Sequence, residues 1–436
     1  MSKNVIKIES TNKELSSRGG IFLFEELSNA ACLESLLAPN LPQYKISTTQ
    51  SPLMKFKALM LGLVAGADSL DDMDRLGCDE AFTAVVGQVN AANTYGEYLR
   101  LFSKLNCKGI QLSLTDFSLK LRESLLPNAK DFILDIDSTD HEQYGKKMEG
   151  VEWNYKGHWC LDSLQAYDQY GFQYWMDVRP GATFTSNGSA ELIHNVFKKV
   201  SKKQNRYLRA DSGSCNIDFF NAANSAEARF VCAMRENMSS PLIKRVKIWK
   251  SSKKLKFRDS RPVEIGRTIY MPVGSQKILQ VVFMRALKPG EQHRSLFKDT
   301  DYDYQAFVTN IGEHEMTNES LVEFYRGRGN AENYIKEGKY GFDLKHFPCQ
   351  SIMANKAYGL IAAFAYNLMR AMAYIENPRR PHFSKVIRFR MVNLACQVVS
   401  HARSVTFRFN NKHFGEVKRW LTLINKLKFG TSLSSA

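Results

Sequence analysis

Acidic residues stand at two places where the surrounding sequence predicts short β-strands. In segment 132–139, FILDIDST, the alternation of side chains puts Ile133, Asp135 and Asp137 on one face of an otherwise mostly apolar strand. In segment 207–213, YLRADSG, Asp211 ends a strand just before a glycine-containing turn, where open α/β sheets bind their ligands. The common alternative for Asp211 is an Asp that begins a turn or caps a helix.

A third carboxylate lies in a predicted helix over residues 319–339. Six residues that are alternately four and three positions apart form one stripe along this helix, namely Leu321, Tyr325, Arg328, Glu332, Ile335 and Lys339. Charged residues take positions that are apolar in an ordinary amphipathic helix, and unpaired buried charges are costly. Either this stripe faces water, or a metal ion and DNA phosphates compensate its charges.

Asp137, Asp211 and Glu332 together form a candidate site for hard cations. Carboxylate oxygens suit Mg²⁺ or Mn²⁺, and the eight cysteines are scattered without a C-x-x-C pair, which disfavours zinc. Two such ions about 4 Å apart can activate an attacking water or hydroxyl and stabilise the leaving oxygen at phosphorus. The three acids therefore predict metal-dependent phosphoryl transfer. Asp135 shares a face with Asp137 and is the alternative first ligand.

The charge of the chain favours a partner that carries phosphate. Lys and Arg number 60 against 44 Asp and Glu, a formal charge of +16. Residues 241–300 alone carry 15 basic and 4 acidic residues, and Trp249, Lys253 and Lys254 lie among them. This concentration favours a phosphate-contacting module over basic residues spread evenly on a solvated surface.

Hydrophobic patterning divides the chain into helical and α/β parts. Residues 21–125 show helical apolar spacing, whereas short apolar or alternating runs begin at Asp131 and predict an α/β domain. Helical segments are expected again after Glu319 and up to about Leu427. The most apolar stretch, 357–375, contains Asn367 and Arg370 and predicts a buried helix rather than a membrane span. The N-terminus has no apolar signal region, so we expect a cytoplasmic protein.

The third acidic segment carries a motif that resembles a known family. Tyr325, Arg328, Glu332 and Lys339 reproduce the Y-x2-R-x3-E-x6-K pattern of DDE insertion-sequence transposases of the insertion-sequence-four type. The chain looks most similar to the branch numbered thirteen-eighty. Segments 134–139 and 208–213 resemble the first and second acidic motifs of the same family. The resemblance to the family extends from about Leu70 to Ala373.

The resemblance implies an α/β fold with an RNase H-like catalytic core and a β-rich insertion between the second and third acids. A helical N-terminal domain for DNA binding or dimerisation would precede the core, and C-terminal helices would follow it. The expected parts are the N-terminal domain 1–125, the first core part 126–236, the basic insertion 237–312, the second core part 313–376 and the C-terminal helical region 377–436.

The resemblance also implies roles for individual residues. Asp137, Asp211 and Glu332 would be the catalytic, metal-binding triad, Arg328 and Lys339 would hold DNA phosphates, and Tyr325 would contact DNA near the scissile end. Such proteins cut DNA through a terminal hairpin at their inverted repeats and join the element to target DNA. Trp249 or a tyrosine of segment 299–310 could stack on an extruded base, because every base has a π-face.

The expected setting is a bacterial cell, with the protein associated with the nucleoid and acting as a homodimer on double-stranded DNA. Two alternatives stay open. One is an RNase H-like nuclease without strand transfer, since the metal chemistry is common to both enzymes. The other is a non-catalytic DNA-binding protein derived from a transposase.

Overall fold

Helices fill the N-terminal part of the chain, as the apolar spacing predicts. The computed structural model describes residues 10–43, 50–145, 147–289, 301–402 and 404–429. Residues 1–9, at the polar N-terminus, and 290–300, at the end of the basic block, lie outside the described residues. The N-terminal helices are α1 (Ile21–Ala30), α2 (Leu33–Leu37), η1 (Ala38–Asn40), α3 (Pro52–Ala65), α4 (Asp72–Leu76), α5 (Glu80–Val86), α6 (Ala92–Arg100) and α7 (Lys104–Leu125).

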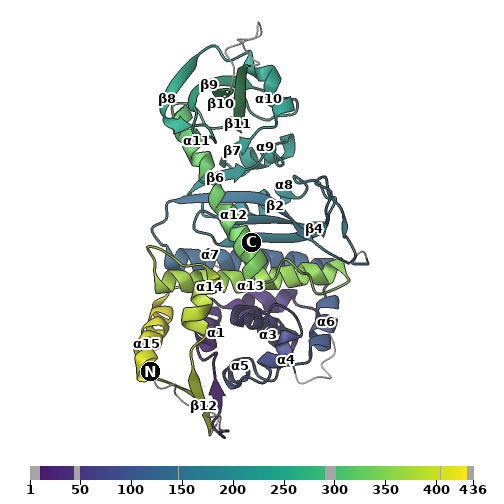
Figure 1. Cartoon of the computed structure of the whole chain (residues 1–436), viewed down its shortest axis with the longest axis vertical. Coiled ribbons are helices and arrows are strands. Elements are labelled where there is room, and N and C mark those ends of the chain that lie inside the picture. Colours follow the sequence, from purple (N-terminus) through teal and green to yellow (C-terminus); the bar gives the residue numbers. More distant parts are fainter. Residues whose placement is uncertain (1–9, 44–49, 146, 290–300, 403, 430–436) are drawn as a thin grey trace, which may run out of the picture.

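A mixed sheet forms the middle of the molecule (Figure 1). Its first strands are β2 (Asp131–Glu142), β3 (Glu152–Trp153), β4 (Trp159–Asp168), β5 (Gln173–Pro180), β6 (Asn205–Ala210) and β7 (Arg229–Ala233). Strand β4 pairs antiparallel with β2, β3 and β5, whereas β6 runs parallel to both β2 and β7. Helices α8 (Ser189–Lys199) and α9 (Ile217–Ser225) form the crossovers between β5, β6 and β7, as parallel strands require.

The basic block continues the same sheet with antiparallel strands. After α10 (Glu236–Ile243) come β8 (Trp249–Lys256), β9 (Pro262–Tyr270), β10 (Leu279–Leu287) and β11 (Tyr302–Thr309). They extend the sheet in the order β7-β11-β10-β9-β8, which makes β8 an edge strand. The β-like composition predicted for this block is therefore confirmed within its described residues.

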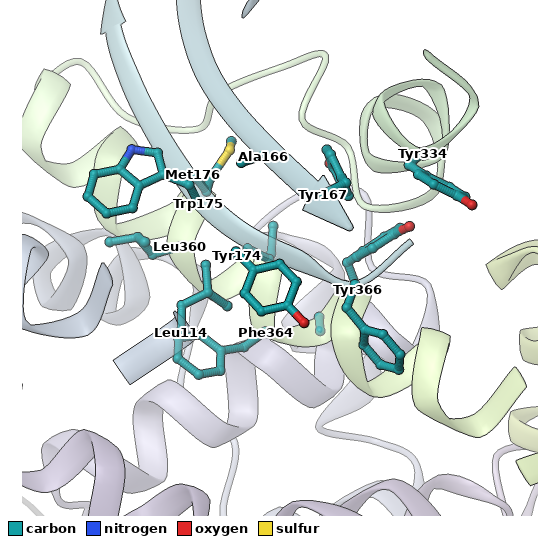
Figure 2. Packing of buried hydrophobic residues seen from close by; sticks show 14 of the residues in the cluster. Leu114, Ala166, Tyr167, Tyr174, Trp175, Met176, Tyr334, Leu360, Phe364 and Tyr366 are labelled. Atoms are coloured by element: carbon teal, nitrogen blue, oxygen red, sulfur yellow. The ribbon is translucent and has the colours of Figure 1, made fainter. Parts of the chain in front are cut away.

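The apolar helix predicted at 357–375 is the core of the molecule. It belongs to α13 (Ile352–Glu376), and every residue from Ala357 to Ile375 is buried. The helix lies between the sheet and the N-terminal helices (Figure 1). Figure 2 shows Leu114 of α7, Tyr174 of β5 and Phe364 of α13 packed together, so one core joins three parts of the chain. Among the described residues, no helix is both long and apolar enough to cross a membrane.

The C-terminal region differs from the helical expectation. After α14 (Ser384–Ile387) and the π-helical turn η3 (Arg388–Val392), strands β12 (Cys396–His401) and β13 (Ser404–Phe409) form a hairpin before α15 (Asn411–Lys426). Strand β1 (Leu15–Ser16), from the other end of the chain, pairs with β12. Alternate residues Cys396 and Val398 are buried against Ala81, which favours a strand at this position. The helical expectation is therefore wrong for the hairpin, whereas α14 and α15 are helices and α15 ends at Lys426, near the expected Leu427.

Candidate functional site

Asp137 and Asp211 follow matched positions on two neighbouring parallel strands. The register of β2 and β6 ends with Ile136 opposite Ala210, so the next residue of each chain segment is one of the two acids. Asp211 also makes a turn, because its Oδ1 accepts hydrogen bonds from the backbone N–H groups of Gly213 at 3.0 Å and Ser214 at 3.3 Å. The turn interpretation of Asp211 is thus correct, and it leaves Oδ2 without a backbone donor among the described residues.

The predicted helix over 319–339 is two helices in the structure. Helix α11 spans Asn318–Arg326 and α12 spans Gly329–Gly341, with Gly327 and Arg328 in a turn between them. Glycine has a low helix propensity. In addition, a Cβ atom on Gly327 would lie 2.4 Å from Nη1 of Arg209, so any larger residue here would displace this guanidinium. The charged stripe therefore bends at Arg328.

Arg328 lies between two of the candidate acids. Its Nη2 is 2.8 Å from Oδ2 of Asp137, and its Nη1 is 3.9 Å from Oε1 of Glu332. The guanidinium is buried, and its Nε has no hydrogen-bond partner in the part of the chain that the structure describes. The charged stripe thus turns Arg328 toward carboxylates rather than toward water. The Glu332 side chain is 61% exposed and remains open to solvent.

Burial and charge act in opposite directions on Asp137. Burial raises the pKa of this carboxyl to about 6, although the adjacent Arg328 lowers it. Asp211 and Glu332 raise the pKa further because like charges disfavour ionisation. A cation held among these groups would offset that repulsion.

The donor set suits a hard divalent cation, but the acids do not form a closed cage. Their oxygens are the ligands that such ions prefer. Within the described residues, however, no three His, Cys, Asp or Glu side chains lie close enough together to hold one ion. Arg328 provides the positive charge among the acids in this arrangement.

Asp135 has a different environment from Asp137. Its two carboxylate oxygens accept hydrogen bonds from Arg209, from Nε at 2.6 Å and from Nη2 at 2.7 Å. Both side chains are almost fully buried, and Arg209 also donates to the backbone oxygen of Phe324 in α11. Asp135 therefore links β2, β6 and α11. Sequence reasoning missed Arg209, although its position two residues before Asp211 on the same predicted strand is a usable signal.

Tyr325 lies near the end of α11, beside the turn between the helices, and Lys339 lies near the end of α12. Tyr325 packs on Phe307 with ring centroids 4.7 Å apart, and burial raises the pKa of its hydroxyl to about 12. Lys339 donates from Nζ to the backbone oxygen of Asp140 in β2 at 2.5 Å. Burial lowers the pKa of Lys339, while the nearby Asp140 raises it. The structure brings Arg328 to the acids, whereas Lys339 holds the far end of β2.

The basic block carries Trp249, Lys253 and Lys254 on its edge strand β8. The two lysines are exposed. Trp249 is half-buried, and the guanidinium of Arg285 lies 4.0 Å from its ring centroid and 4.2 Å from that of Tyr302. Trp249 is thus already stacked on a cation in this structure.

A cavity of about 610 Å³ lies between strand β11 and the turn after Asp211. It lies among α10, β11 and α11, and Ser212 is part of its wall. Aromatic and basic side chains line much of the rest, namely Phe257, Tyr302, Tyr304, Phe307, Tyr325, Arg258, Lys288 and Arg326. The sequence pointed to Tyr325 and to a tyrosine of segment 299–310, but the shared cavity could not be predicted, because its residues come from separate segments.

The mixed sheet and its helices make this a mixed α/β protein, with Asp137 inside β2 level with Asp211, which directly follows the end of β6. The particular family follows from comparison with known proteins. The family model described as transposase DDE domain group 1 matches residues 1–428, and the chain therefore belongs to the DDE transposases. No curated protein matches the chain. The family acts in DNA transposition and generally uses divalent metal ions.

Proposed function

We propose that this protein is an insertion-sequence transposase of the insertion-sequence-four type, similar to the branch numbered thirteen-eighty. It would bind terminal inverted repeats, cut the DNA through hairpin ends and join the element to target DNA. The observation that carries this proposal is the placement of Arg328 and Glu332, two members of the Y-x2-R-x3-E-x6-K motif, beside Asp137. Asp211 adjoins them at the end of the parallel neighbour strand.

We also propose that the core is RNase H-like. The strand order β5-β4-β2-β6-β7 supports this, with three antiparallel strands followed by two parallel ones. The insertion would then be 237–312, between core parts 126–236 and 313–376. Regions 1–125 and 377–436 would flank the core, and the enzyme would act as a homodimer on DNA in the bacterial cytoplasm.

Asp137, Asp211 and Glu332 would hold Mg²⁺, or Mn²⁺ in its place. Such ions lower the pKa of an attacking water or hydroxyl and stabilise charge on the leaving oxygen in phosphoryl transfer. The residues of the chain would orient the DNA. Arg328 would neutralise charge next to Asp137, Lys339 would fix β2 and reach phosphate, and Tyr325 would contact DNA beside the cavity.

The deciding experiment uses DNA that carries the inverted repeats flanking the gene of this protein. We expect the purified protein with Mg²⁺ to cut at the repeat ends and to join the released 3′ hydroxyl to a second DNA. Cutting without joining would indicate a nuclease. Specific binding without any cutting would indicate a non-catalytic DNA-binding protein.

The basic edge strand gives a prediction for DNA affinity. Replacing Lys253, Lys254, Lys256 and Arg258 by Ala should flatten the dependence of log affinity on log salt by up to about 3.6, because each phosphate contact contributes about 0.9. All four side chains are exposed. The matched control replaces the exposed residues Lys130, Lys198, Lys202 and Lys203, which lie near the amino ends of β2 and β6. Equal slopes for both variants would show that the block is only a solvated surface.

The aromatic groups give a prediction for the hairpin step. Extruding a base costs a few kcal/mol, and stacking on an aromatic ring returns about 1 to 3 kcal/mol. Replacing Trp249 by Ala, or Tyr304 in a second variant, should spare the first nick and slow hairpin formation or opening. Denaturing gels of end-labelled DNA separate the nicked DNA, the hairpin and the opened hairpin. Unchanged proportions of these products in both variants would refute an aromatic platform in the insertion. The Arg285→Ala variant tests a second point, namely whether the cation beside Trp249 competes with the extruded base.

A further inference from the structure

A second concentration of positive charge lies outside the insertion. Residues 377–436 contain 12 basic residues and one acid, so their net charge of +11 equals that of residues 241–300. The first part of this region, segment 377–392, connects α13 to β12 and includes α14 and η3. It carries five basic residues and no acid, namely Arg379, Arg380, Lys385, Arg388 and Arg390.

Two of these five basic residues have structural roles. Arg388 donates hydrogen bonds to the backbone oxygens of Val64, Leu63 and Gly341 at 2.9, 2.9 and 2.7 Å, which fixes the segment to α3 and α12. Arg390 forms an ion pair with Glu376 at 2.6 Å. Arg379, Arg380 and Lys385 are exposed, and within the described residues none of them forms an ion pair. Three positive charges therefore face solvent uncompensated.

Exposed aromatic side chains accompany these charges. Phe383 is 51% exposed, Phe389 is 76% exposed and Tyr340, near the end of α12, is 74% exposed. Phe383 immediately precedes α14, and Phe389 lies in η3. Large apolar rings among unpaired cations are unusual on a surface that contacts only water, but both groups suit a polyanion with apolar sugars and bases.

This surface adjoins the helix that carries Glu332. The backbone N–H of Ser384 donates to Glu337 of α12, and Arg388 bonds the last residue of the same helix, Gly341. Glu332, Lys336 and Tyr340 are exposed at intervals of four residues, so they form one stripe along α12. At 1.5 Å per residue this stripe is about 12 Å long. It leads from the candidate site to segment 377–392.

We propose that the α12 flank, defined as Lys336, Tyr340, Arg379, Arg380, Phe383, Lys385 and Phe389, is a second binding surface for duplex DNA. It contacts the phosphate backbone through its cations and is separate from the basic edge strand β8. The exposed stripe of α12 gives the duplex a continuous path from Glu332 to the cations of segment 377–392. This proposal rests on the proposed function, since the duplex is the DNA that the enzyme acts on.

The test measures binding of the full-length protein to an inverted-repeat duplex over a range of salt concentrations, with EDTA present so that nothing is cut. Arg379→Ala, Arg380→Ala and Lys385→Ala in one variant should flatten the salt dependence by up to about 2.7 and weaken binding at low salt. Adding the substitutions of Lys253, Lys254, Lys256 and Arg258 should flatten it further, because two surfaces contribute separately. The control variant replaces Lys198, Lys202 and Lys203 and should keep the slope of the unmodified protein.

The proposal is overturned if the salt dependence has the same slope in the variant of Arg379, Arg380 and Lys385 as in its control. Phe389→Ala should weaken binding several-fold without changing the slope, whereas Phe414→Ala, an exposed ring on α15, should have no effect. A change of oligomeric mass in Phe389→Ala, with DNA affinity retained, would assign the ring to contact between copies and would also refute the proposal. Because binding is measured without metal, its outcome is independent of whether the unmodified protein cuts DNA with Mg²⁺.

Discussion

DNA cutting is expected to fall by roughly a thousandfold or more when Asp137 or Asp211 is replaced by Asn, or Glu332 by Gln. Metal ions contribute several kcal/mol of charge stabilisation in phosphoryl transfer, and about 1.36 kcal/mol corresponds to each tenfold in rate. Removing one carboxylate that holds the ions therefore removes most of the rate. End-labelled DNA with Mg²⁺ measures the effect directly. Binding of the repeats should change little, since phosphate contacts dominate affinity.

The matched control for these variants is Glu323→Gln. Glu323 is an exposed acid on α11, close in sequence to the site. The Glu323→Gln variant should cut DNA as fast as the unmodified protein. Asp137→Asn also removes the charge partner of buried Arg328, so its thermal unfolding must be compared with that of the unmodified protein before a loss of cutting is interpreted. Full cutting by a folded Asp211→Asn or Glu332→Gln variant would contradict the triad.

Local patterns in the sequence were sufficient for much of the architecture. Alternating and short apolar runs located β2 and β6 within a few residues, and the apolar run at 357–375 located the buried part of α13. These predictions succeed because each depends on the periodicity of one element and the burial of one face. The placement of Asp137 level with Asp211 also follows, once β2 and β6 are parallel neighbours.

Contacts between distant segments could not be predicted in the same way. Arg209 and Asp135 are 74 residues apart, and their pairing depends on the sheet register. The close approach of Arg209 to Gly327 likewise joins segments that are distant in the sequence. The basic residues of segment 377–392 were counted in the total charge, but their exposure beside α12 depends on hydrogen bonds to Glu337 and Gly341.

Asp135→Asn is expected to destabilise the protein by about 3 to 5 kcal/mol, because it leaves the buried guanidinium of Arg209 without its charge partner. Burial raises the pKa of Asp135, while the hydrogen bonds and charge of Arg209 lower it. Urea unfolding measures the loss. Asp177→Asn is the control, since Asp177 forms a partly exposed ion pair with Lys356 and should cost about 1 kcal/mol or less.

The same variant decides which acid of β2 belongs to the catalytic site. Both oxygens of Asp135 are occupied by Arg209, whereas Asp137 faces Arg328, Asp211 and Glu332. Under conditions in which it is still folded, the Asp135→Asn variant should therefore cut DNA. The Asp137→Asn variant should remain folded and fail to cut. Replacing Asp135 and Arg209 together by Leu and Met should recover part of the lost stability, because no buried charge then lacks a partner. A stable Asp135→Asn protein without cutting, beside an active Asp137→Asn protein, would move the first ligand to Asp135.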